Sequence, residues 1–200
     1  MSFYIYIFDE TPVRLWGLSS SQRIRRELEW ELSSKGKDQG RPARDAIEFV
    51  DDLQQVPPER DVLLLRGDYL YDVRVTINLI ASVDTLLQVI ENGARVPVAA
   101  HTSAAAASLV MQHIRDSNRE LPGKLNIETP ASIVPQSQVR LKKAHAAFVL
   151  PVSEKNSQAL EKHLFKTAYK GVTDLVTKWV WPTPAHWVTR LCVRLGLLPN

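Results

Sequence analysis

The sequence predicts an α/β fold in which a mainly parallel sheet is flanked by helices. Short apolar runs rich in β-branched and aromatic residues alternate with segments of helical periodicity along the 200 residues. The run Val62-Leu63-Leu64-Leu65 is apolar at every position, which is typical of a strand covered on both faces. We therefore expect an α/β domain over residues 1–152 and a C-terminal amphipathic helical segment over residues 153–200.

The composition excludes several classes of protein. Hydrophobic residues make up 44% of the chain, against 8 glycines and 12 prolines, so collagen-like and wholly disordered chains are excluded. Cys192 is the single cysteine, which excludes an internal disulfide framework and indicates a reducing compartment. No run of about 18 uncharged apolar residues occurs, so we expect no membrane-spanning helix within these residues.

Each element is predicted from its own local pattern. Apolar runs rich in β-branched or aromatic side chains predict strands over residues 3–8, 46–50, 61–68 and 146–152. The Asn92-Gly93 pair predicts a β-hairpin that joins residues 86–90 to 96–100. Apolar residues at helical spacing predict helices over residues 22–34, 72–81, 104–114 and 154–169. Residues 121–135 contain three prolines and are expected to be irregular.

Asp68 is the candidate metal ligand. It ends the apolar strand, and ligands of open α/β sheets gather beyond the carboxyl ends of the strands. A carboxylate in that place can hold Mg²⁺ against the phosphates of a substrate. Two structural roles stay open for the same residue: Gly67-Asp68 can form a simple turn, or Asp68 can cap the helix that follows.

Arg14 and Arg23 are candidate phosphate ligands, because they flank the start of the first predicted helix, where backbone amides also favour anions. The alternative is an ordinary charged helix surface, since the next turns carry Arg25, Arg26, Glu27, Glu29 and Glu31. P-loop and Rossmann glycine patterns are absent, and the histidines have no metal-ligand spacing.

The charge of the chain is concentrated at its C-terminal end. Residues 1–138 have a net charge of −4, whereas residues 139–200 have one of +7. Cationic and tryptophan side chains there flank apolar helix faces, as in segments that lie at a membrane interface: Lys170, Lys178, Trp179, Trp181, Trp187, Arg190 and Arg194. The sequence equally allows a solvated basic face, or a helix pair that packs on the domain.

The C-terminal residues resemble the segment before the membrane domain of CDP-alcohol phosphatidyltransferases. The resemblance rests on YKGVTDLVTK (residues 169–178), Trp181-Pro182, Thr189-Arg190 and GLLPN (residues 196–200). It implies a transmembrane domain beyond Asn200, an anionic membrane surface as partner, and a place at the cytoplasmic face of the cell membrane. The parent protein would transfer a phosphoalcohol group from a CDP-alcohol in phospholipid synthesis.

Some members of that family carry a nucleotidyltransferase-like domain of the glycosyltransferase-A type in front, which residues 3–152 resemble. Arg14-Leu15-Trp16-Gly17-Leu18 is similar to the end of its signature loop, and residues 63–68 are similar to the strand that ends in its metal-binding aspartate. The resemblance implies CTP or a CDP-alcohol as ligand, with Arg14, Gly17 and Arg23 at the nucleotide and Asp68 at Mg²⁺. No nucleic-acid partner is expected.

The signature loop departs from the family pattern, which is rich in glycine. Here it contains Asp9, Glu10 and Pro12, with no glycine before Gly17. Carboxylates repel a triphosphate, and a proline lacks an amide donor. A degenerate domain is therefore expected. An active cytidylyltransferase, a non-catalytic nucleotide-binding or regulatory module and a separate binding protein are the alternatives.

Overall fold

The central feature is a six-stranded sheet with the order β2-β1-β3-β6-β5-β7. The structure, a computed structural model, describes residues 3–35, 47–135, 145–168 and 182–196. The pairings show that β6 alone runs against the other five strands, which confirms a mainly parallel sheet. The strands are β1 (Phe3–Phe8), β2 (Ile47–Val50), β3 (Asp61–Arg66), β5 (Thr85–Glu91), β6 (Ala94–Ser103) and β7 (Asn126–Glu128).

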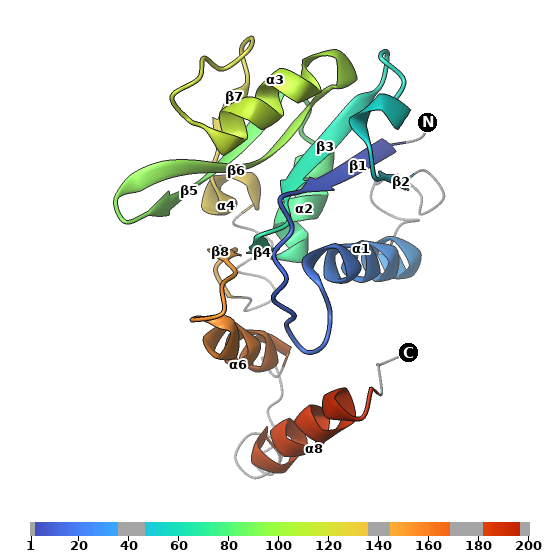
Figure 1. Cartoon of the computed structure of the whole chain (residues 1–200), viewed down its shortest axis with the longest axis vertical. Helices are drawn as coiled ribbons and strands as arrows, with labels where there is room; N and C mark the ends of the chain where they lie inside the picture. The colour runs from blue at the N-terminus through green and yellow to red at the C-terminus, as the bar shows by residue number, and fades with distance from the viewer. Residues whose placement is uncertain (1–2, 36–46, 136–144, 169–181, 197–200) are drawn as a thin grey trace.

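Helices cover both faces of this sheet (Figure 1). Leu63 and Leu65 of β3 belong to a buried cluster with α1 and α2, whereas Val62 and Leu64 belong to one with α3. All four side chains are fully buried, as expected for a central strand of a covered sheet. The helices are α1 (Ser20–Lys35), α2 (Val73–Ile80), α3 (Ala104–Arg115), α4 (Pro130–Ile133), α6 (Ser157–Ala168) and α8 (Pro182–Arg194), with a short 3₁₀ turn η2 (Leu53–Gln55).

The predicted helices and the predicted hairpin are confirmed. The ends of α1, α2, α3 and α6 lie within a few residues of the predicted ones. Asn92 and Gly93 join β5 to β6 with φ angles of 50° and 82°, the left-handed pair that a tight hairpin turn requires.

Three predictions need correction. The strand predicted over residues 61–68 ends at Arg66, and a second short strand, β4 (Tyr69–Tyr71), follows the turn and pairs with β8 (Val149–Pro151) in a separate two-stranded sheet. The strand predicted over residues 146–152 is therefore shorter and lies outside the central sheet. The region predicted to be irregular, residues 121–135, contains β7 and α4. Three- and four-residue elements are too short to show a period in the sequence.

The C-terminal helices α6 and α8 lie at the end of the molecule that is farther from the central sheet (Figure 1). Leu160 of α6 is buried in a small cluster with Leu15, Leu70 and Val152, so α6 packs on the α/β domain. Residues 169–181 of the predicted C-terminal helical segment lie outside the described residues. None of the helices that the structure describes is long and apolar enough to cross a membrane.

We expect Tyr71→Phe to lower the free energy of unfolding by about 1–3 kcal/mol, because two backbone groups lose their partner. The buried hydroxyl of Tyr71 donates to the carbonyl of Val98 at 2.8 Å and accepts from the amide of Arg66 at 3.1 Å. Denaturant unfolding measures the loss. Tyr6→Phe is the matched control, since the hydroxyl of Tyr6 has no hydrogen bond within the described part of the chain. Equal effects of the two changes would contradict this role of Tyr71.

Candidate functional site

The candidate site lies at the edge of the sheet where the five aligned strands end. Ligands of open α/β sheets gather at this edge. The segment between β1 and α1 begins there with Asp9 and Glu10, and the turn between β3 and β4 contains Gly67 and Asp68. The amide of Gly67 donates to the carbonyl of Phe8 at 2.7 Å, so the two segments are in direct contact.

Asp68 is engaged by an arginine through both carboxylate oxygens. Nε of Arg66 donates to Oδ1 at 3.0 Å and Nη2 donates to Oδ2 at 2.6 Å. A magnesium ion on Asp68 would have to displace this bidentate partner, so the residues present do not fit the expected Mg²⁺. The turn interpretation of Gly67-Asp68 is confirmed. The capping interpretation is wrong, because Asp72 caps α2 by accepting from the amide of Arg74.

Asp9 is engaged in the same way by an arginine of α3. Nε and Nη2 of Arg115 in α3 donate to its two carboxylate oxygens at 2.8 and 2.6 Å. These hydrogen bonds are the main cause that holds the pKa of Asp9 below its ordinary value. Asp9 after β1 and Asp68 after β3 are thus both paired with guanidinium groups.

Glu10 occupies the N-terminus of α1. Its Oε1 accepts hydrogen bonds from the amide and from the hydroxyl of Ser21, both at 2.9 Å. Burial raises the pKa of Glu10, but the hydrogen bonds from Ser21 and Ser19 and the charge of Arg14 together outweigh this effect, and the pKa falls below its ordinary value. The first amides of a helix are where a phosphate would bind, and here a carboxylate of the chain itself occupies that place.

Gly67 allows the two segments to approach closely. A Cβ atom at Gly67 would lie 2.7 Å from Cα of Glu10 and 2.9 Å from its Cβ. Such distances exclude a side chain unless the backbone shifts. The turn after β3 therefore packs directly against the backbone of the segment that would have to wrap a triphosphate.

The predicted nucleotide ligands lie further along this segment and in the first turn of α1. Leu15 to Leu18 form a tight hairpin turn with Trp16 and Gly17 at φ angles of 50° and 77°. Nη1 of Arg14 donates to the carbonyl of Gly17 at 3.4 Å, and Arg23 donates to the carbonyl of Leu15. The structure thus brings Arg14, Gly17 and Arg23 together around one turn, where they hold the backbone.

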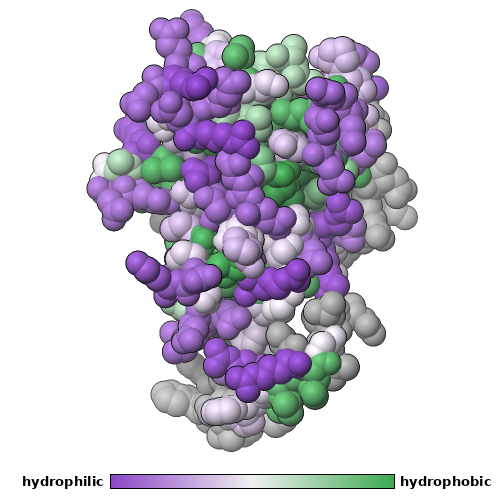
Figure 2. Space-filling view, in the orientation of Figure 1, coloured by the Kyte–Doolittle hydropathy of each residue, from purple (hydrophilic) through white to green (hydrophobic). Residues whose placement is uncertain are grey.

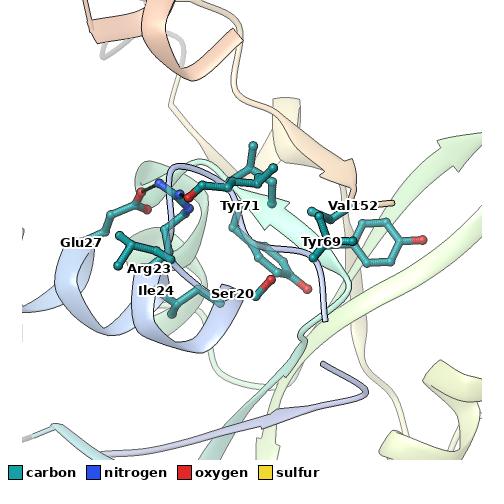
Figure 3. A pocket seen from close by; sticks show the side chains of 11 residues that line it. Ser20, Arg23, Ile24, Glu27, Tyr69, Tyr71 and Val152 are labelled. Atoms are coloured by element: carbon teal, nitrogen blue, oxygen red, sulfur yellow. Dashed lines mark hydrogen bonds and ion pairs between the residues drawn. The ribbon is translucent and has the colours of Figure 1, made fainter. Parts of the chain in front are cut away.

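Arg23 lies in the wall of a small pocket (Figure 3). Arg23 and Glu27 point toward each other at one end of it, and their nearest charged atoms are 3.9 Å apart. The empty volume, mouth included, is about 290 Å³. The lining residues are Val13, Leu15, Leu18, Ser20, Arg23, Ile24, Glu27, Tyr69, Leu70, Tyr71 and Val152.

Glu27 is a carboxyl group in the wall of this pocket that the sequence did not reveal. Burial raises its pKa to about 7, Arg23 opposes this shift and the negative charge of Asp72 adds to it. In the sequence Glu27 is one of several alternating charges on α1 and was interpreted as ordinary helix surface. The signal that could have revealed it is its position between Ile24 and Leu28, which form the buried face of the helix.

Glu161 joins the C-terminal helices to the segment after β1. Its Oε1 accepts from the amide of Trp16 at 3.0 Å, and its backbone carbonyl accepts from the indole Nε1 of Trp16 at 3.2 Å. Arg190 of α8 lies 3.6 Å from its other carboxylate oxygen. Of the predicted interface residues, Trp187, Arg190 and Arg194 are exposed on α8. Lys170, Lys178, Trp179 and Trp181 lie outside the described residues.

No family model and no curated protein matches this chain. Among the described residues, no group of three or more histidine, cysteine, aspartate or glutamate side chains is arranged to hold a metal ion. The site is therefore characterised by its own contacts, which are ion pairs and hydrogen bonds within the chain.

We expect Glu27→Gln to flatten the pH dependence of stability. The pKa of Glu27 is 4.5 in the unfolded chain and about 7 in the folded one. As the pH rises, the unfolded state therefore loses the proton of Glu27 first. The contribution of Glu27 to the free energy of unfolding is therefore complete at low pH and is lost as the pH rises through about 7. The difference in melting temperature between about pH 5 and about pH 8 should shrink in the variant. Glu59→Gln, at an exposed loop position, is the control; an equal change in both would contradict the assignment.

Proposed function

We propose that this chain is a non-catalytic, nucleotidyltransferase-like domain of a CDP-alcohol phosphatidyltransferase family protein. The parent protein would transfer phosphoalcohol groups from CDP-alcohols at the cytoplasmic face of a membrane. The observation that carries the non-catalytic part is the Glu10 carboxylate on the amide and hydroxyl of Ser21, where an active domain of this kind would wrap the triphosphate.

The sheet is compatible with the nucleotidyltransferase-like part of this proposal. Five strands end at one edge, and the apolar strand β3 leads to Asp68 there. This is the place that the family resemblance implies for a metal-binding aspartate. The α/β class is general to many activities, so the proposal depends on Asp68 and on the segment after β1 rather than on the architecture.

The contacts at the edge disfavour the alternative of an active cytidylyltransferase. A triphosphate brings several negative charges, and two arginines that the structure describes at the edge are already paired with carboxylates: Arg66 with Asp68 and Arg115 with Asp9. Binding would have to separate these pairs and also move Glu10 from α1. The proposed role is therefore a packed scaffold in front of the membrane domain, with no turnover of its own.

We expect the folded chain to release no measurable pyrophosphate from CTP in the presence of Mg²⁺ and inositol phosphate or glycerol phosphate. The reason is that the triphosphate place is filled by Glu10 and the metal place by Arg66. A coupled phosphate assay measures turnover, and titration calorimetry measures binding of Mg·CTP. Turnover at about 1 s⁻¹ or more that is lost in Asp68→Asn would overturn the proposal.

The family part of the proposal has a separate test. The gene should encode, beyond Asn200, several transmembrane helices and the paired-aspartate motif of CDP-alcohol phosphatidyltransferases. A reading frame without that motif would remove the proposed parent activity, while the assay above would still decide whether the domain is catalytic.

A further inference from the structure

Helix α8 contacts the other described residues through one side. The ring of His186 packs edge-on against Trp16 and Phe165, with centroid distances of 5.4 and 5.3 Å. Arg190, one turn further along the same side, lies 3.6 Å from the carboxylate of Glu161. The side of α8 with these polar groups therefore faces α6 and the turn after β1.

The opposite side of α8 is apolar and exposed. The exposed fractions are 73% for Trp187, 59% for Val188, 57% for Leu191 and 66% for Leu195. Their spacing places them on one helix face, which we call the outer face of α8. In Figure 2 hydrophobic atoms gather at the lower end of the molecule, where Figure 1 places α8. A continuous apolar face of this kind on a protein surface indicates an interaction site.

The charges beside this face are basic. Residues 182–196 contain Arg190 and Arg194 and no acidic residue, and residues 139–200 as a whole have a net charge of +7. A tryptophan-containing apolar face with arginines beside it is the composition of helices that lie in a membrane interface. A second copy of this chain is a poorer occupant, because a symmetric contact between two outer faces would bring like charges together.

We propose that the outer face of α8 binds directly to the surface of an anionic lipid bilayer. The helix lies in the interface with Trp187, Val188, Leu191 and Leu195 among the lipid headgroups and the upper acyl chains. Arg194 lies level with the lipid phosphates, and His186 and Arg190 stay on the protein side. This inference stands on the contacts and exposure of α8 and does not depend on the proposed function.

The test uses the full chain of 200 residues and two kinds of vesicle, phosphatidylcholine alone and an equimolar mixture with phosphatidylglycerol. Co-sedimentation should show binding to the anionic vesicles only, and added salt should weaken it. Trp187→Ser with Leu191→Ser should reduce the affinity at least about tenfold, because most of the inserted apolar area is lost. Arg194→Gln should reduce it about fivefold.

Leu109→Ser is the matched control. Leu109 lies on α3 and is exposed to almost the same extent as Leu191, 56% against 57%, so its exchange should leave vesicle binding unchanged. Equal binding to both kinds of vesicle would overturn the proposal, as would equal effects of Leu109→Ser and Leu191→Ser. A dimer in sedimentation equilibrium that Leu191→Ser dissociates, with no vesicle binding, would also overturn it and assign the outer face to a second copy.

Discussion

The carboxylates of Asp9 and Glu10, which follow β1, fix the path of the segment between β1 and α1. The packing at this edge of the sheet depends on their contacts. Glu10 binds the first turn of α1 and Asp9 binds Arg115 of α3, so the chain leaves β1 between the helix layers on both faces of the sheet. Gly67 then packs against the backbone at Glu10. Because no space remains between them, this segment and the turn after β3 form one packed unit, and Asp68 is held beside it by Arg66.

The same segment is where the C-terminal helices join the domain. Trp16 has a positive φ, which is uncommon outside glycine, and such a conformation persists only where the surroundings determine it. Glu161 supplies those surroundings by accepting from both the backbone amide and the indole of Trp16, and it also binds Arg190. One residue of α6 thus links α8 to the turn that contains Gly17 and that Arg14 contacts.

The features that the sequence predicts are those with a local signal. The apolar run of β3 and the Asn92-Gly93 hairpin can each be predicted from neighbouring residues alone. The pairing of β4 with β8 was missed because three residues show no period and the partner strand is far along the chain. The contacts of the site were hidden for the same reason. Asp9 and Arg115 are 106 positions apart, so a pattern around either residue says nothing about their pairing.

Charge compensation distinguishes the two ends of the molecule. The pairs Asp68–Arg66 and Asp9–Arg115 are partly exposed, and such pairs contribute only about 0–1 kcal/mol to stability. Their larger effect is on binding, because a ligand must separate charges that already satisfy each other before it gains any contact of its own. The outer face of α8 has no such internal partner among the described residues, and its apolar side chains are exposed to solvent. Favourable free energy of association is therefore available at α8, whereas at the sheet edge a ligand would first have to separate the existing ion pairs.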